Sequence, residues 1–507
     1  RVVVVSSTQI PHIVRRIVGQ ALGIPWGQVR VIKPYVGGGF GNKQEVLYEP
    51  LNAFLTMQVG GRPVKIELTR EETFTNTRTR HSIEYDMEAG VDEEGHLLAK
   101  EMTTYSNQGA YASHGHAIAA NGLTASRLQY ACPNIRGEAY TVYTNCPTAG
   151  AMRGYGIPQV ATESFMDDIA YEIGMDPLEF RRKNLIHGYY EDAYLKPIAA
   201  NTNGIFECLE KGAEYIHWDE KRKAYQNQTG DIRRGVGMAL FSYKTGVWPI
   251  SLEIAGARLS LNQDGSVQLQ VGATEIGQGA DTVFSQMAAE TLHMDISRVH
   301  IVTQQDTDVT PFDTGAYASR QSFVTGTAVK ECAQQLKQKI LEYARTLVPG
   351  NVDRLELEDG YILADGKPAI SLEDLAMESY YSLSNSSVLT AEVSRQVKKN
   401  TVASGCCFAE EEVDVKLGKI KVLDIVNVHD SGTLLNPQLA AMQVHGGMFM
   451  GIGYGVSEQL LIDEKTGRPL NGTLLDYKLM TMMDTPDIKA DFVELDDPIG
   501  PFGNKAL

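Results

Sequence analysis

Four glycine-rich segments are the parts of this 507-residue chain whose composition and spacing best suit chemistry. They are Gly37-Gly38-Gly39-Phe40-Gly41-Asn42-Lys43, Ala151-Met152-Arg153-Gly154-Tyr155-Gly156, Gly272-Ala273-Thr274-Glu275-Ile276-Gly277-Gln278-Gly279 and Gly315-Ala316-Tyr317-Ala318-Ser319-Arg320. Because glycine has no Cβ atom, such a loop can bring its main-chain N–H groups close to an anionic ligand. A single loop of this kind is more often a tight turn, but four in one chain favour one extended anionic cofactor.

Two of these loops lead directly into expected helices. Gly279 precedes a helix expected over 281–291, and Ser319 precedes a long amphipathic helix expected over 322–347. A helix N-terminus presents unpaired N–H donors and therefore favours phosphate or an oxo anion. The first segment has neither the spacing of a P-loop nor the surroundings of a dinucleotide fingerprint, so the ligand is not predicted from those motifs.

Other constellations carry weaker signals. His114 and His116 are two residues apart without a third metal ligand, which is more typical of an ordinary loop. No G-x-S-x-G nucleophile elbow is present in the sequence. Cys406 and Cys407 lie in an apolar stretch, which favours packing over redox chemistry.

The elements that must position these loops follow a repeated pattern. Residues 1–6 are expected to form a buried strand, residues 11–22 a helix and residues 29–32 a second strand. Leu22, Ile24, Val29 and Val31 are matched, after the second expected helix, by Leu292, Met294, Val299 and Ile301. The repeat predicts two similarly built halves that face each other across a cleft.

The remaining patterning predicts an α+β fold with two domains. Hairpins are expected over 257–271, around Asp264-Gly265, and over 405–428, around Leu417-Gly418. Strands and helices mix without a regular βαβ rhythm. The polar stretch 218–234 is the best boundary candidate, which gives domains over 1–225 and 235–507.

Composition excludes several classes of function. The chain has 46 Lys and Arg against 63 Asp and Glu, a formal net charge of −17, so neither nucleic acid nor an anionic membrane surface is an expected partner. Its most apolar stretch, residues 439–456, contains Gln443 and His445 and is not expected to span a membrane. Six cysteines without a C-x-x-C pair favour the reducing cytoplasm and argue against an iron–sulfur cluster held by this chain.

Taken in order, the motifs resemble the molybdenum-cofactor-binding subunit of the xanthine dehydrogenase/xanthine oxidase family, in the style of bacterial purine hydroxylases. The resemblance covers nearly the whole chain. The motifs that carry it are GGGFGNK, AMRGYGIPQ, GATEIGQG, GAYASRQS, and Asp430 to Pro437 followed by Gln443 to Gly446. It implies two large cofactor-binding halves with molybdopterin, expected as a dinucleotide, between them.

The resemblance also implies roles for individual residues. Main-chain amides at Phe40, Gly41, Arg153 and Ala318 match positions around the molybdenum, with no side-chain ligand to the metal. Gln278 and Gln443 match glutamines that hydrogen-bond the pterin. The phosphate-bearing part is matched by Thr274 to Gly279 and by Ser319 to Gln321. The implied cofactor-binding set is Phe40, Gly41, Arg153, Thr274, Gln278, Gly279, Ala318, Ser319, Gln321 and Gln443.

The family chemistry is hydroxylation of an electron-poor carbon beside a ring nitrogen, or of an aldehyde carbon, with oxygen taken from water. The resemblance implies a glutamate as general base and partner subunits or domains with 2Fe–2S clusters and FAD that accept the electrons. It also implies a homo-oligomer of the whole complex. The general base follows a segment like 500–507 in the family, so it is expected just after Leu507. The chain is expected to be a fragment that lacks both ends, and a naturally split subunit is the alternative.

Three positions set the expected substrate. Gln44 stands where xanthine-oxidising relatives have a glutamate, and Glu45 should point elsewhere if the segment is extended. Asn121 stands where they have an arginine, and Tyr155 where they have a stacking phenylalanine. The resemblance makes a purine hydroxylase the first hypothesis, although Gln44 and Asn121 do not match the xanthine-binding pair. A nicotinate-like or aldehyde substrate, a non-catalytic scaffold and a nucleotide-binding regulator are the alternatives.

Overall fold

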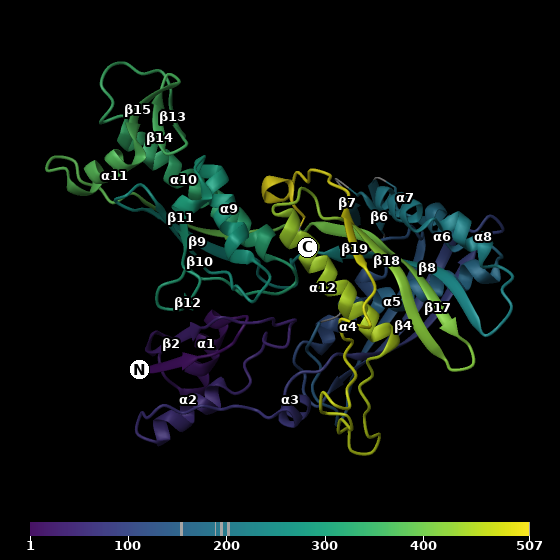
Figure 1. Cartoon of the computed structure of the whole chain (residues 1–507). Coiled ribbons are helices and arrows are strands. Elements are labelled where there is room, and N and C mark those ends of the chain that lie inside the picture. The colour runs from purple at the N-terminus through teal and green to yellow at the C-terminus, as the bar shows by residue number, and fades with distance from the viewer. Residues whose placement is uncertain (153–155, 188, 193–195, 200–202, 506–507) are drawn as a thin grey trace.

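The computed structural model describes residues 1–152, 156–187, 189–192, 196–199 and 203–505. Its strands form six sheets with helices packed on them, an α+β architecture as expected (Figure 1). The helices are α1 (Pro11–Leu22), α2 (Glu49–Gln58), α3 (Arg70–Asn76), α4 (Gly115–Ala125), α5 (Gly156–Glu172), α6 (Pro177–Asn184), α7 (Ile205–Ile216), α8 (Trp218–Ala224), α9 (Ala280–Leu292), α10 (Gly326–Ala344), α11 (Leu372–Tyr381) and α12 (Pro437–Val456). Among the described residues, none of the helices combines the length and the apolar character that crossing a bilayer requires.

The sheets that surround the glycine-rich loops are small. Three of them have the strand orders β1 (Val2–Val5)–β2 (Val29–Lys33)–β12 (Gln305–Asp306), β11 (Val299–Ile301)–β10 (Val267–Val271)–β9 (Ile254–Leu261)–β16 (Thr390–Gln396), and β19 (Ile488–Phe492)–β18 (Lys419–Asp430)–β17 (Val402–Asp414)–β8 (Ile232–Lys244). The others are β3 (Ser82–Val91)–β4 (Leu97–Gly109)–β5 (Asn134–Tyr143), β13 (Leu355–Glu358)–β14 (Tyr361–Ala364)–β15 (Lys367–Ser371) and β6 (Tyr189–Asp192)–β7 (Lys196–Ala199).

The predicted repeat is confirmed as two βαβ units. β1 pairs in parallel with β2 after α1, and β10 pairs in parallel with β11 after α9. In both units a short 3₁₀ turn separates the helix from the second strand. The expectation that residues 1–6 form a buried strand is wrong in part, because Val3 and Val5 are 53% and 64% exposed. β1 is an edge strand with α1 on one face, so its other face is open.

The two units also join each other. β12, from the second half of the chain, pairs antiparallel with β2 of the first half. Arg30 on β2 forms an ion pair with Asp306 on β12. This pairing brings the loop after β2 and the loop after β10 together, and the N–H of Gly38 donates to the carbonyl of Ile276 at 2.6 Å.

Both predicted hairpins are confirmed, as β9–β10 and β17–β18. Packed hydrophobic cores hold these elements, and the largest joins β9, β10, α9 and α10. A second core joins α5, α7 and Trp218 to β8, β17 and β18. Cys406 is a fully buried free thiol of this second core, which agrees with a packing role. The division of the chain at 225–235 stays a prediction.

Candidate functional site

One large cavity, about 1680 Å³ in volume, lies where the loops meet. Its walls come from loops of both βαβ units, from α4 and from α12, which packs on β18 and β19. Nine of the residues expected at a site line it, namely Phe40, Gly41, Gln44, Asn121, Gln278, Ala318, Ser319, Gln321 and Gln443. Thr274 is fully buried, and Gly279 lies against Leu439 of α12. Arg153 and Tyr155 lie outside the described residues.

The cavity wall contains several sharp backbone bends at residues other than glycine. Phe40, Met152, Ala318 and Ser319 have φ values of 50°, 44°, 48° and 49°, in the left-handed region that side chains disfavour. Such bends are kept where the surrounding structure enforces them, often at functional sites. Among the described residues, the N–H groups of Phe40, Ala318 and Ser319 have no hydrogen-bond partner. They are therefore available to an anionic or electron-rich ligand.

A buried glutamine that sequence reasoning missed ties these bends together. Gln9 is 3% exposed, lines the cavity, and accepts the N–H of Gly41 on its side-chain oxygen at 3.1 Å. Its Nε2 donates to the carbonyl of Ala316 at 2.5 Å, and its own carbonyl accepts from Thr274 Oγ1 at 3.2 Å. The available signal was an uncharged polar pair, Thr8-Gln9, between a strand and the start of a helix.

The glutamines of the second half form a network behind the wall. Gln278 and Gln321 are hydrogen-bonded to each other, and both donate from Nε2 to the carbonyl of Thr274 at 3.1 Å. Gln278 Oε1 also accepts the N–H of Ile276 at 2.7 Å. These bonds fix the glutamine side chains before any ligand binds, which lowers the cost of ordering them later.

A carboxylate within the loop that precedes α9 accepts hydrogen bonds from the N–H groups of that loop. Glu275 accepts the N–H groups of Gly277 and Gly279 on Oε1, at 2.7 and 3.2 Å, and that of Asp281 on Oε2 at 3.0 Å. A carboxylate at a helix N-terminus is favoured by the helix dipole. An external phosphate at this helix, as expected from the sequence, stays a prediction and would have to share or displace this carboxylate.

The same helix start gives Asp281 an unusual proton affinity. Burial and the neighbouring charge of Glu275 raise the pKa of Asp281 from 3.8 to about 7, and Lys33 opposes the shift. The folded state therefore holds this proton to a higher pH than the unfolded chain. Stability from this group is full below about pH 4 and is lost as the pH rises toward 7.

We expect Asp281→Asn to raise the melting temperature relative to wild type more at pH 8 than at pH 5.5. The asparagine stays neutral, so it avoids the cost of a buried carboxylate that wild type meets at high pH. Thermal melts of both proteins at the two pH values measure this. An equal difference at both would contradict the raised pKa.

Two fully buried ionic groups hold segments of the cavity wall. Arg320 pairs with Glu253 and Asp313, which fixes the bend at Ala318 and Ser319. Lys505 pairs with Asp430 where β18 ends. All five charged side chains are at most 1% exposed. A buried pair of this kind is costly to break, because the remaining charge stays buried.

Four further residues of the cavity wall carry a buried polar side-chain atom that has no partner among the described residues. Asn427 Oδ1, His429 Nε2, Ser431 Oγ and Asn504 Oδ1 are buried, unpaired atoms of cavity-lining residues. Burial lowers the pKa of His429 to about 4, so its ring is neutral near pH 7. The free main-chain donors fit the anionic groups of a large cofactor, and the amide oxygens of Asn427 and Asn504 are acceptors that suit its N–H groups.

The end of the cavity that contains Gln44 and Asn121 differs from expectation at one position. Residues 40–43 form a turn and the segment is not extended, so the condition under which Glu45 was expected to point elsewhere is not met, and Glu45 lines the same cavity as Gln44. Its carboxylate is held by an ion pair with Arg78 and by hydrogen bonds from Ser113 and His114. Glu45 is therefore a paired charge in this wall.

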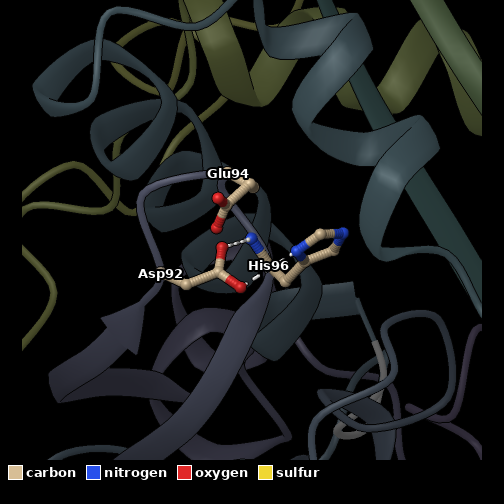
Figure 2. A group of neighbouring side chains, drawn as sticks. All are labelled: Asp92, Glu94 and His96. Carbon is tan, nitrogen blue, oxygen red and sulfur yellow. Dashed lines mark hydrogen bonds and ion pairs between the residues drawn. The ribbon is translucent and has the colours of Figure 1, made fainter.

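A separate group of possible metal ligands lies in the turn between β3 and β4 (Figure 2). Asp92 accepts the N–H of His96 at 2.7 Å and lies 3.0 Å from its Nδ1, and these bonds lower the pKa of Asp92. Glu94 and His96 are exposed, and Figure 2 shows the Asp92 carboxylate directed at His96. The arrangement is that of a turn-stabilising aspartate.

Comparison with known proteins agrees with this geometry. Two family models, each described as a molybdopterin cofactor-binding domain, match residues 1–185 and 211–486. The putative xanthine dehydrogenase molybdenum-binding subunit XdhA of Escherichia coli K12 is 50% identical over 518 residues, covering 100% of this chain and 68% of that protein. The probable hypoxanthine oxidase XdhD of the same strain is 33% identical, covering 100% of this chain and 53% of that protein.

A solved structure has the same fold. Quinoline 2-oxidoreductase from Pseudomonas putida 86 superposes with a TM-score of 0.91 at 25% identity, covering 99% of this chain and 66% of that chain. The chain therefore spans between about half and two thirds of the length of these proteins.

Proposed function

Because the chain belongs to the molybdopterin cofactor-binding family of xanthine dehydrogenase-like subunits, we propose that it hydroxylates a purine carbon in a molybdenum-dependent complex. The family membership confirms the resemblance seen in the sequence and identifies molybdopterin as the cofactor. Its relatives are molybdenum-dependent oxidoreductases.

The observation that carries the proposal is the convergence of unpaired main-chain donors on one cavity. Phe40, Ala318 and Ser319 come from segments nearly 280 residues apart, yet their free N–H groups belong to residues of one wall. We assign the donors of Phe40 and Ala318 to the oxo and dithiolene groups of the cofactor, and that of Ser319 to its phosphate-bearing part. Gln443 and Gln278 are assigned to the pterin, and Arg153, Gly41, Thr274, Gly279 and Gln321 complete the proposed set.

When bound, the cofactor supplies a two-electron oxidant and activates water as a nucleophile near neutral pH. The chain's own residues bind and orient the substrate. Gln44 and Asn121 each offer a donor and an acceptor to the edge of a purine ring, and Tyr155 is assigned a stacking role. The buried Lys505–Asp430 pair fixes residues 500–505, the segment after which the general-base glutamate is expected.

The proposal extends to partners and compartment. Electrons captured in the reaction need acceptors, and we propose subunits or domains with 2Fe–2S clusters and FAD, in a complex that forms homo-oligomers. The likeness to XdhA supports these partners. The six free thiols support a cytoplasmic location. A dinucleotide form of the pterin is proposed from the resemblance alone.

A substrate screen tests the proposal. The purified, cofactor-loaded complex is assayed by dye reduction with hypoxanthine, xanthine, nicotinate and an aromatic aldehyde. The proposal expects reduction with at least one purine, with the product oxygen derived from ¹⁸O-labelled water. Turnover of aldehydes only would contradict the purine assignment.

A further inference from the structure

Arg80 is a cationic residue of the cavity wall that neither the resemblance nor the comparisons assign to the site. It lies between α3 and β3, and it lines the cavity together with Gln44 and Asn121. The carbonyl of the preceding Thr79 accepts the N–H groups of Gly150 and Ala151, at 2.8 and 3.1 Å. The backbone that carries Arg80 is thereby fixed to a glycine-rich loop.

This loop connects Arg80 to the segment that contains Phe40 and Gly41. The N–H of Met152 donates to the carbonyl of Phe40 at 2.6 Å. A Cβ atom on Gly41 would lie 3.1 Å from the carbonyl of Gly150 and 3.8 Å from Gln44 Oε1. Residues 150–152 thus contact both the backbone beside Arg80 and the segment that contains Phe40 and Gly41.

The guanidinium of Arg80 has no counter-charge among the residues that the structure describes. Its Nε is buried without a hydrogen-bond partner, and no carboxylate of the described residues lies within ion-pair distance. Glu45 is the carboxylate of this cavity wall and is neutralised by Arg78. An unpaired, partly buried cation is costly, and an anionic ligand removes that cost.

Aromatic rings flank the Arg80 side chain. Its guanidinium carbon lies 4.8 Å from the centre of the Tyr454 ring. Burial raises the pKa of the Tyr85 and Tyr477 phenols, and the nearby charge of Arg80 opposes this shift. The Tyr477 hydroxyl donates to Glu458 at 2.8 Å, so that carboxylate is already engaged. A planar guanidinium held beside rings suits a planar anion.

We propose that Arg80 is a specificity-determining residue that binds a delocalised negative charge on the substrate, either an oxo-purine ring anion or a carboxylate on an N-heteroaromatic ring. The inference rests on the proposed function of the same cavity. Gln44 and Asn121 are neutral amides that can read the ring edge, and Arg80 supplies the charge that they lack. The binding class of this cavity is thus a planar aromatic monoanion.

The test compares matched neutral and anionic ligands on the full-length, cofactor-loaded complex. The pairs are nicotinamide with nicotinate, and hypoxanthine with xanthine at pH 8.5, where xanthine carries more negative charge. Binding is measured by isothermal titration calorimetry for wild type, Arg80→Gln, Arg80→Lys and Arg16→Gln. Arg16 is the control, because it lines the same cavity from an exposed position on α1.

Arg80→Gln is expected to weaken binding of the anionic ligand of one pair by about tenfold to a hundredfold. Binding of its neutral partner should weaken by less than about threefold. Arg80→Lys should fall between wild type and Arg80→Gln, and Arg16→Gln should leave the ratio of anionic to neutral affinity unchanged. The pair that responds identifies whether the charge is a ring anion or a carboxylate.

Equal losses for both members of each pair, no change for either, or the same selectivity loss in Arg16→Gln would overturn the role of Arg80. So would a wild-type complex that binds neither anion. A selective loss of anion binding in a complex that turns over no purine would instead contradict the purine assignment and leave the role of Arg80 standing.

Discussion

Arg320→Met is expected to destabilise the core around β9 and α10 by about 3 to 5 kcal/mol and to abolish cofactor retention. Arg320 is fully buried and pairs with Glu253 and Asp313. It also donates to the carbonyls of Ile254 and Gly315, at 2.7 and 3.0 Å. Methionine fills much of the volume but leaves two buried carboxylates without a cation.

The expected loss of cofactor follows from the position of Arg320 in the chain. Arg320 directly follows the strained bend at Ala318 and Ser319, whose free N–H groups are assigned to the cofactor. Without the ion pairs of Arg320, we expect this bend to relax from its left-handed conformation.

Urea unfolding and molybdenum content of the purified chain measure the two effects. Arg258→Met is the matched control, because Arg258 pairs with Glu392 on the surface, with side chains 36% and 54% exposed. The control substitution should lower the free energy of unfolding by less than about 1 kcal/mol, and the variant should retain molybdenum. Equal behaviour of the two variants would show that Arg320 is not an anchor of the site.

Asp430→Ala is expected to cost about 3 to 5 kcal/mol, because the fully buried ammonium of Lys505 loses its counter-charge. Asp430 also accepts the N–H groups of Gly204 and Gly432, at 2.7 and 3.1 Å. The carbonyl of Lys505 in turn accepts the hydroxyl of Thr245 at 3.0 Å. One carboxylate thus joins the end of β18 to two other segments.

Hydrogen exchange measured by mass spectrometry reports this change locally. Peptides that contain residues 500–505 should exchange markedly faster in Asp430→Ala than in wild type. Asp231→Ala removes an exposed partner of Lys416 and serves as the control, with no expected change in those peptides. Unchanged protection in Asp430→Ala would contradict the anchoring role.

Local patterns in the sequence were sufficient to predict many elements. The helix over 11–22 and both hairpins follow from apolar spacing and turn residues, and they form as expected. The second βαβ unit was visible because the same apolar positions recur after both helices. α10 begins later than expected, at Gly326, because a π-helical turn over Gln321–Thr325 precedes it.

The tertiary contacts of the site could not be predicted from the sequence. The Glu275 carboxylate accepts hydrogen bonds from N–H groups of its own loop, and residue spacing does not predict this interaction. Glu45 faces the cavity because its segment turns, and Arg78 then neutralises it. Gln9 lies more than 260 residues from Thr274 in the chain, and tertiary contacts such as the β2–β12 pairing bring the two together.

The measurement that tests the central claim most directly is the metal and pterin content of the full-length protein, produced with its electron-transfer partners in a host that makes the cofactor. Inductively coupled plasma mass spectrometry and the fluorescence of oxidised pterin are read on the same folded sample. The account predicts about one molybdenum and one pterin per chain, in keeping with a single metal-activated site. A folded, fully assembled complex without either would contradict it.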